Sequence, residues 1–324
     1  MARIEYGAAL AYSPAIRQRK WCGLYLAAAV RLNHNRLMPE LPEVETVCRG
    51  LETALAGKRL SKVIQRRPDL RFPIPQGFAD RLTGRRIEAI RRRAKYICIS
   101  LDNGLVLLLH LGMSGRLMIR SGRPNVPPQA HDHLVFQADD GSVVIFNDAR
   151  RFGMVDLIDG ADIAAHPWLR GLGPEPLADS FNAATLQAAL AGKRTPIKTA
   201  LLDQRIVAGL GNIYVCEALY YAGISPRRSA HTIGARRAAR LVPAIKKVLR
   251  EAIAKGGSSL RDYVQTSGEL GYFQHDFAVY GKAGEPCPSC PVNTAPAAGQ
   301  ISCNGVKRIV QSGRSSFYCT REQR

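Results

Sequence analysis

The sequence contains no charge-free apolar run approaching the roughly 18 residues that a membrane-spanning helix needs. Acidic residues are also scarce: 26 Asp+Glu stand against 46 Lys+Arg, which gives a formal net charge of +20 and a pI near 10.0. Apolar residues still make up 46% of the 324 residues, which excludes wholesale disorder. We therefore expect a soluble globular protein of two or three domains whose basic surface suits a polyanion, which leaves DNA, RNA and an acidic membrane surface open.

The eight cysteines fall into two groups. One group is scattered among apolar or mixed surroundings and is expected to consist of buried thiols: Cys22, Cys48, Cys98 and Cys216. Gathered in the last 38 residues are Cys287, Cys290, Cys303 and Cys319. Because the chain has no clear secretory signal, the second group indicates a metal site rather than disulfides, in a reducing cytoplasm.

Residues 1–37 differ from the rest of the chain. They hold six Lys/Arg and one Glu, and the short apolar stretch CGLYLAAAV loosely imitates a signal or transit peptide. The stretch is short and no convincing small-residue cleavage site precedes Met38. The simpler interpretation is translated upstream sequence with Met38 as the true start, and its removal would lower the net charge only to +15.

From Met38 onward the hydrophobic pattern predicts three structural regions. Apolar residues at helical spacing from Leu41 to Leu55 follow MPE, with Pro42 in the first turn, and they predict an amphipathic helix. Apolar runs separated by DNG and DDG turns then predict a β-sandwich; these are YICISL (96–101), LVLLLHL (105–111), HLVFQA (133–138) and SVVIFN (142–147). After GLGPEPL (171–177) the hydrophobic periodicity becomes helical. From about Glu285 the chain is short, bears cysteines and is too small to fold without a stabilising cross-link or metal ion.

Eight blocks of sequence resemble, in order, the formamidopyrimidine-DNA glycosylase family. They are MPELPEVETV, RRRAKYICI, HLGMSGRL, NDARRFG, LGPEPL, LLDQRIVAGLGNIYVCEALYYAGISP, GYFQHDFAVYG and QSGRSSFYC. The resemblance implies an α+β fold with a catalytic β-sandwich domain at 38–170, a helix-two-turns-helix DNA-binding domain at 171–284 and a zinc finger at 285–324, with 1–37 an extension. It also implies a monomeric enzyme that removes oxidised purines, 8-oxoguanine and formamidopyrimidines, from double-stranded DNA and then cleaves the strand.

Four residues match the family's catalytic positions. A free α-amino group has a reference pKa of about 7.7–8, so Pro39 becomes a nucleophile near neutral pH once Met38 is removed, and its Schiff base with the sugar drives β- and δ-elimination. Glu40 matches the general acid that protonates the sugar ring oxygen. Lys95 matches the lysine that contacts phosphate and donates a proton during β-elimination, and Arg314 matches the finger arginine that grips phosphate beside the lesion.

An enzyme that acts on a stacked base must extrude it and fill the gap. Met113, Arg150 and Phe152 match the family's inserting residues, with Arg150 facing the orphaned cytosine and Phe152 wedging the stack. Further positions match DNA contacts, mostly to the backbone: His110, His131, Arg151, Arg194, Lys198, Asn212 and Tyr280. The loop TSGELGYF (266–273) matches a segment that closes over the extruded base.

The finger departs from the family pattern of two Cys-x-x-Cys knuckles. Cys287 and Cys290 form the first knuckle, but Glu322 stands where the fourth cysteine should follow Cys319. Three outcomes stay open: Cys303 completes a four-cysteine zinc site, Glu322 coordinates as an oxygen ligand, or no stable zinc site forms.

Two other functions remain open from the sequence. An enzyme of the endonuclease VIII type would prefer oxidised pyrimidines, although ELPEVE and the set of Met113, Arg150 and Phe152 favour the purine type. If translation begins at Met1, Pro39 has an ordinary amide nitrogen, and the chain becomes a non-catalytic binder of damaged DNA.

Overall fold

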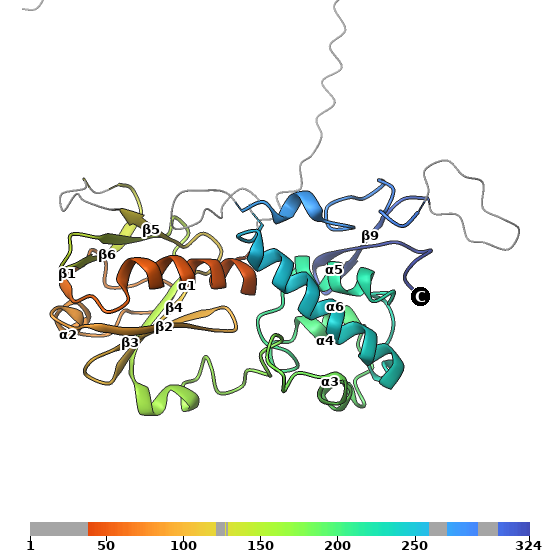
Figure 1. Ribbon diagram of the computed structural model, residues 1–324, viewed down its shortest axis with the longest axis horizontal. Helices are drawn as coiled ribbons and strands as arrows, with labels where there is room; N and C mark the ends of the chain where they lie inside the picture. The colour runs from red at the N-terminus through yellow and green to blue at the C-terminus, as the bar shows by residue number, and fades with distance from the viewer. Residues whose placement is uncertain (1–37, 121–126, 128, 259–270, 291–303) are drawn as a thin grey trace, which may run out of the picture. The chain divides into compact units, whose positions relative to one another are not determined.

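The computed structural model describes residues 38–120, 127, 129–258, 271–290 and 304–324 (Figure 1). The extension 1–37, most of the predicted loop at 266–273 and Cys303 therefore lie outside the described residues. Among the helices that are described, none combines the length and the apolar character needed to cross a membrane.

The first half is built on two four-stranded antiparallel sheets. One sheet has the strand order β1-β6-β7-β5 and the other the order β2-β3-β4-β8. The strands are β1 (Leu60–Gln65), β2 (Ile87–Arg93), β3 (Tyr96–Leu101), β4 (Leu105–His110), β5 (Arg116–Arg120), β6 (Asp132–Ala138), β7 (Val143–Asn147) and β8 (Met154–Asp159). Side chains from both sheets meet in one buried apolar cluster, so the predicted β-sandwich is confirmed.

Helix α1 (Leu41–Leu55) packs along this sandwich and contacts β2 and β3 of one sheet and β5 of the other (Figure 1). Its start is set by local chemistry: the carboxylate of Glu43 accepts a 3.0 Å hydrogen bond from the backbone N–H of Glu40, which closes a capping box. Pro42 sits in the first turn, where its missing N–H costs nothing. The residues at helical spacing, from Leu41 to Leu55, are buried, as the sequence predicts.

The second half is helical. Its elements are α3 (Ala183–Leu190), α4 (Ile197–Leu202), α5 (Asn212–Tyr221) and α6 (Ala235–Ala254). Short elements complete the described chain: α2 (Phe78–Leu82), η1 (Gly160–Ala165), η2 (Ala230–Thr232) and η3 (Phe273–Asp276). Helix α5 is buried over nearly its whole length in the core of this half, whereas α6 is amphipathic and accommodates Pro243 in its interior.

A hairpin of β9 (Lys307–Gln311) and β10 (Arg314–Tyr318) follows the helices. Its two-residue turn consists of Ser312 and Gly313, both at positive φ (48° and 73°), which suits a tight hairpin turn. Phe317, on β10, is buried in the same cluster as the helices, so the hairpin packs against the helical half.

Candidate active site and metal centre

The start of α1 holds Pro39 and Glu40, and both are buried. Oε1 of Glu40 accepts a 3.0 Å hydrogen bond from the backbone N–H of Ile213, at the start of α5. Within the described part of the chain, the buried Oε2 has no hydrogen-bond partner. Burial raises the pKa of Glu40 to about 7, against the opposing effect of the positive charge of Lys95, so a large fraction of this carboxyl is protonated near neutral pH.

Glu43 supports Glu40 from one turn further along α1. Besides the N–H of Glu40, its carboxylate accepts hydrogen bonds from the hydroxyl of Tyr214 and from the N–H (2.8 Å) and hydroxyl (2.9 Å) of Ser258. Glu43, Tyr214 and Ser258 are not among the residues that the sequence motifs predict for the site. Glu43 sits inside a capping-box pattern, and this familiar helix-start role gave no signal that its second oxygen binds residues far along the chain.

The sequence GLGN (209–212) brings the backbone against α1. A Cβ atom on Gly211 would collide with the side chain of Glu40, and Gly209 lies at φ 84° against Leu41. The N–H of Leu41 donates a 3.1 Å hydrogen bond to the carbonyl of Gly209. Glycine at 211 is therefore needed so that the start of α5 can reach the Glu40 carboxyl.

Lys95 lies in the two-residue turn between β2 and β3, after Ala94. Burial lowers the pKa of Lys95, and the charge of Arg314 lowers it further, whereas the charges of Glu40 and Glu43 oppose the shift. These interactions place the ammonium in the electrostatic neighbourhood of both Glu40 and Arg314. The structure thus brings together residues that the sequence separates by more than 200 positions.

Arg314 is exposed at the start of β10, and two predicted DNA contacts anchor the strand beside it. Nζ of the buried Lys198 donates to the carbonyl of Ser315 (2.8 Å), and so does Nδ2 of Asn212 (3.0 Å). Asn212 also donates to the Tyr280 hydroxyl at 3.3 Å.

The segment that carries Tyr280 is held by a residue absent from the sequence predictions. Glu217 on α5 accepts hydrogen bonds of 2.8–3.0 Å from the backbone N–H groups of Ala278, Val279 and Tyr280. A glutamate inside the apolar helix α5 is the signal that could have revealed this role, because a buried carboxylate needs partners.

The three predicted inserting residues lie on two loops that touch. Gly112 packs so closely against the backbone of Phe152 that a Cβ there would collide with it, which brings the Met113 turn against the Arg150–Phe152 loop. The guanidinium of Arg150 lies 4.6 Å from the ring centroid of Phe152, and the Phe152 side chain is 41% exposed.

Buried Asp148 organises this second loop. It accepts hydrogen bonds from the Ser114 hydroxyl and from the N–H groups of Arg150 (3.3 Å) and Gly153 (2.7 Å). The loop therefore presents an exposed aromatic ring and a cation from a fixed backbone.

The remaining predicted contacts are spread more widely. His110 is half-buried at the end of β4 beside Tyr96, and burial together with Lys95 and Arg71 lowers its pKa to about 4, which keeps it neutral. His131, Arg151 and Arg194 are exposed. In the described part of the chain, none of these exposed side chains hydrogen-bonds to Glu40 or to its partners.

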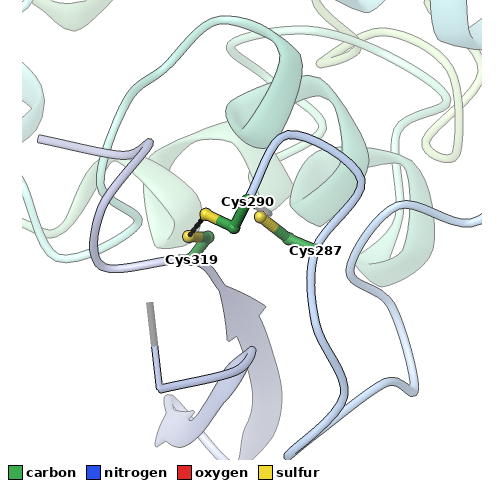
Figure 2. A group of neighbouring side chains, drawn as sticks. All are labelled: Cys287, Cys290 and Cys319. Atoms are coloured by element: carbon green, nitrogen blue, oxygen red, sulfur yellow. Dashed lines mark hydrogen bonds between the residues drawn. The ribbon is translucent and has the colours of Figure 1, made fainter. Parts of the chain in front are cut away.

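Three cysteines converge at the end of the hairpin (Figure 2). The Sγ atoms of Cys287, Cys290 and Cys319 are buried and lie within 4.8 Å of one another, with 3.6 Å between those of Cys290 and Cys319. Sulfur atoms around a tetrahedral zinc ion are about 3.8 Å apart, given Zn–S bonds of about 2.3 Å, so this donor set fits zinc. Oε1 of Glu322 lies 3.8 Å from Sγ of Cys290, while Cys303 is outside the described residues.

The other described cysteines, Cys48, Cys98 and Cys216, are buried, as the sequence predicts, and are not part of this group of three sulfur atoms. Burial raises the pKa of Cys98 and of Cys216 to about 11 and that of Cys48 still further, so all three are neutral thiols at physiological pH.

Family models of known proteins match both the N-terminal and the C-terminal half of the chain. The model of the formamidopyrimidine-DNA glycosylase N-terminal domain matches residues 38–155, and that of the formamidopyrimidine-DNA glycosylase H2TH domain matches residues 172–264. A formamidopyrimidine-DNA glycosylase of Rhodospirillum centenum is 61% identical over 297 residues, covering 89% of this chain and 100% of the relative.

Two solved structures are similar over most of the chain. The MutM (Fpg) protein of Thermus thermophilus has a TM-score of 0.75 at 37% identity and covers 88% of this chain and 98% of its own. A complex between the Lactococcus lactis Fpg and DNA containing an abasic site has a TM-score of 0.77 at 32% identity, with 88% and 100% coverage. The predicted order of a β-sandwich and a helix-two-turns-helix domain is thereby confirmed.

Proposed function

This chain belongs to the formamidopyrimidine-DNA glycosylase family and is a base-excision repair enzyme, and we propose that its chemistry runs through the secondary amine of Pro39. Its substrates are oxidised purines, including 8-oxoguanine and formamidopyrimidines, and abasic sites in double-stranded DNA. The amine attacks C1′ of the damaged nucleoside, the bond from C1′ to the base breaks, and a cationic Schiff base forms. That cation accepts electrons when the C2′ proton is lost, and the C3′–O bond breaks; loss of the C4′ proton from the resulting conjugated cation then breaks the C5′–O bond.

The observation that supports this proposal most strongly is the state of Glu40. Its carboxyl is next to Pro39 in the chain, has a pKa raised to about 7 so that a large fraction is protonated at neutral pH, and within the described residues has one oxygen without a hydrogen-bond partner. A general acid needs a proton that is available at working pH and an atom that faces the reacting group. The raised pKa of Glu40 supports the first requirement and its oxygen without a partner among the described residues is available for the second, so we assign it the protonation of the sugar ring oxygen.

Lys95 and Arg314 are assigned to the phosphates and to elimination. The lowered pKa of Lys95 makes it a better proton donor and acceptor near neutral pH than an ordinary lysine. Arg314 is exposed, is always charged and stands beside the anchored Ser315 carbonyl, which suits a grip on the phosphate beside the lesion.

The duplex is held by the other predicted contacts. Met113, Arg150 and Phe152 fill the space left by the extruded base, because their two loops lie against each other. His131, Arg151 and Arg194 contact the backbone from exposed positions, and Tyr280 and Asn212 do so beside Arg314. Among the described residues the buried Lys198 makes one side-chain hydrogen bond, to Ser315, which leaves N–H groups that we assign to a phosphate, and His110 donates as a neutral ring.

The chemistry requires that nothing is attached to the nitrogen of Pro39. We propose that the active chain starts at Met38 and loses that methionine. The family match begins at residue 38, and the 61% identical relative is matched along its entire length while covering 89% of this chain, which supports the proposal. The relatives are bacterial, and we place the enzyme in the cytoplasm, where it acts as a monomer.

The three-cysteine cluster is proposed to bind one zinc ion. Zinc supplies folding energy to a segment too small to form its own core, and so it fixes the hairpin that carries Arg314. The position of Glu322 beside Cys290 supports a carboxylate as the fourth ligand, and Cys303 is the other candidate.

The test of the proposed function compares chains that begin at Met1 and at Met38. Each is checked by intact mass and then treated with borohydride on duplex DNA containing 8-oxoguanine. We expect the chain that has lost Met38 to form a covalent adduct and to cleave the strand. The chain that keeps residues 1–37 should do neither. If the shorter chain binds the DNA and gives no adduct, the protein is a damaged-DNA binder without catalysis.

A further inference from the structure

The turn that carries Lys95 has a backbone conformation that its sequence does not favour. Ala94 has φ 54°, in the left-handed region that costs a residue with a Cβ about 1 kcal/mol or more. No glycine relieves this turn, and Ala94 is 1% exposed. Such a conformation persists only when the surroundings hold it in place.

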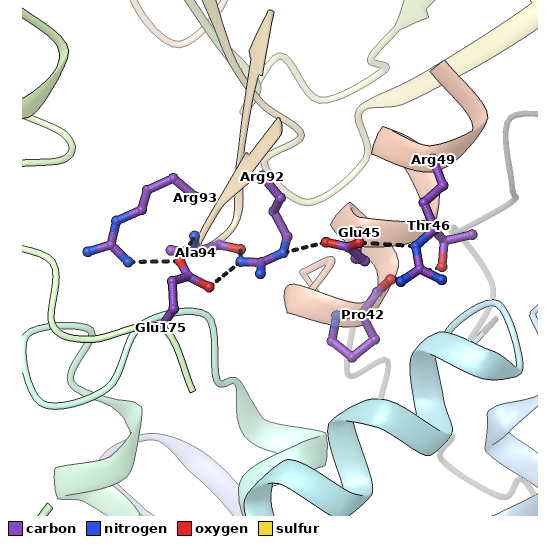
Figure 3. A network of polar contacts seen from close by, with 8 residues as sticks. All are labelled: Pro42, Glu45, Thr46, Arg49, Arg92, Arg93, Ala94 and Glu175. Carbon is purple, nitrogen blue, oxygen red and sulfur yellow. Dashed lines mark hydrogen bonds and ion pairs between the residues drawn. The ribbon is translucent and has the colours of Figure 1, made fainter. Parts of the chain in front are cut away.

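The surroundings hold both polar groups of the Ala94 backbone (Figure 3). Its N–H donates a 2.6 Å hydrogen bond to Oε1 of Glu175, and its carbonyl accepts a 3.1 Å hydrogen bond from Nη1 of Arg92. The same Nη1 of Arg92 lies 2.6 Å from Oε2 of Glu175. Carboxylate, guanidinium and peptide unit thus form a closed ring around the residue that precedes Lys95.

Further contacts fix the two partners of this ring. Arg93 contacts Oε1 of Glu175 at 2.8 Å and donates to the carbonyls of Leu172 and Gly173, so the segment that carries Glu175 is tied to the end of β2. The side chain of Arg92 is 9% exposed and also pairs with Glu45 of α1 at 2.9 Å (Figure 3). Because buried charge pairs often add little net stability, we expect these pairs to act here by fixing the backbone.

We infer that Glu175 is a positioning residue for Lys95: by clamping the Ala94 peptide it sets where the ammonium stands relative to the start of α1. The inference rests on the proposed function, because Lys95 needs a fixed place only if it serves the elimination step. Proton transfer requires the donor within hydrogen-bond reach of the reacting group, and a displacement of about 1 Å costs up to about 100-fold in rate. Both oxygens of Glu175 bind groups of the protein, namely Arg92, Arg93 and the N–H of Ala94, so its proposed effect on the reaction runs through the position of Lys95.

Glu45 provides a matched control. Like Glu175, its side chain is 23% exposed and contacts Arg92, but the hydrogen bonds to Ala94 come from Glu175 and Arg92. The Glu175→Ala, Glu175→Gln and Glu45→Gln variants of the chain that begins at Pro39 are compared on duplex DNA with a preformed abasic site. Strand cleavage in a single turnover, borohydride-trapped adduct and affinity for DNA with a non-cleavable abasic analogue are measured for each.

The expected pattern separates two steps of the reaction. With Glu175→Ala, cleavage slows by about 10-fold or more while the trapped adduct stays at or above the wild-type level, since the Schiff base forms and then waits for elimination. Glu175→Gln keeps one acceptor for the Ala94 N–H and lies in between, and Glu45→Gln stays within about 2-fold of the wild type in all three measurements.

Two results would overturn the inference. One is cleavage by both Glu175 variants at the rate of Glu45→Gln. The other is a parallel loss of trapping and cleavage, which would mean a general structural role; if Glu175→Ala does not fold, Glu175→Gln carries the same comparison. Wild-type protein that neither traps nor cleaves would instead refute the proposed function.

Discussion

The backbone N–H of Ile213 donates a 3.0 Å hydrogen bond to Oε1 of Glu40, although 173 positions separate the two residues in the chain. This bond joins the first turn of α1 to the first turn of α5. Within the described residues the second oxygen of the carboxyl has no hydrogen-bond partner, which leaves it for the proposed acid role.

The Gly211→Ala variant tests the close approach that makes this bond possible. The added Cβ would collide with the side chain of Glu40, so we expect excision to fall by about 100-fold or more. The free energy of unfolding should fall by about 1–3 kcal/mol, as is usual for overpacking. Excision rates and urea unfolding curves measure the two effects. Gly171→Ala is the control, because a Cβ at Gly171 has no atom within 4 Å, and a loss of equal size in that variant would refute the explanation.

The dependence of the excision rate on pH should reflect the protonation of the Glu40 carboxyl. Its pKa of about 7 means that the required proton is lost as pH rises above 7, while the amine of Pro39 gains activity as it deprotonates near pH 7.7–8. The profile should therefore be bell-shaped with an optimum between about pH 7 and 8. Glu40→Gln should slow excision by about 100-fold and lose the descending limb, whereas Glu52→Gln, exposed on the same helix, should keep it.

The same carboxyl should make stability depend on pH. Its pKa is raised from 4.5 in the unfolded chain to about 7 in the folded one, so the folded state binds the proton more tightly. The resulting stabilisation is fully present below about pH 4.5 and is lost as pH rises through about 7. The loss is on the order of 3 kcal/mol. Urea unfolding at pH 5 and pH 8.5 should show that Glu40→Gln, which never ionises, gains on the wild type at the higher pH; an equal difference at both values would contradict this.

Phe152→Ala should separate base extrusion from strand cleavage. Without the ring, the gap in the stack stays open, and we expect excision of 8-oxoguanine to slow by about 10-fold or more. Cleavage at a preformed abasic site should change less, since no base has to be unstacked there. Tyr221→Ala is a suitable control, because Tyr221 is 44% exposed, close to the 41% of Phe152, and lies on α5. Equal losses on both substrates would exclude the wedge role.

The metal ligands can be resolved by counting zinc atoms per chain. We expect one in the wild type and none in Cys319→Ser, together with weaker DNA binding, because the hairpin that carries Arg314 loses its anchor. Glu322→Ala should release zinc to a chelator faster, and Glu322→Cys should retain it longer, since a fourth thiolate completes the preferred set. If Cys303→Ser loses zinc while Glu322→Ala keeps it, Cys303 is the fourth ligand.

The local hydrophobic pattern of the sequence predicts most of the strands correctly. YICISL coincides with β3, and LVLLLHL, HLVFQA and SVVIFN match β4, β6 and β7 within a residue or two, because apolar runs between turn signals have few other solutions. The pairing order of the two sheets is not local, and no single run predicts that β8 lies beside β4.

The residues of the candidate site also fall into two groups, those that sequence motifs predict and those that only the folded chain brings together. The motifs pointed to Glu40 and Lys95, but the partners that tune them came from tertiary structure. Tyr214 and Ser258 resemble ordinary core and loop residues in sequence, and Glu175 sits in the linker-like LGPEPL. Their roles arise only where distant segments meet, so spacing along the chain gives no signal for them.

The bond from Ile213 to Glu40 also bears on how a DNA-cutting protein is safely made. The proposed nucleophile Pro39 and the proposed acid Glu40 directly precede α1, while the N–H that binds Glu40 belongs to a segment synthesised some 170 residues later. A nascent or partly unfolded chain can thus display basic surface and bind the genome, yet it lacks an assembled cutting centre. On the proposed mechanism, strand scission therefore requires that α5 has folded against the start of α1.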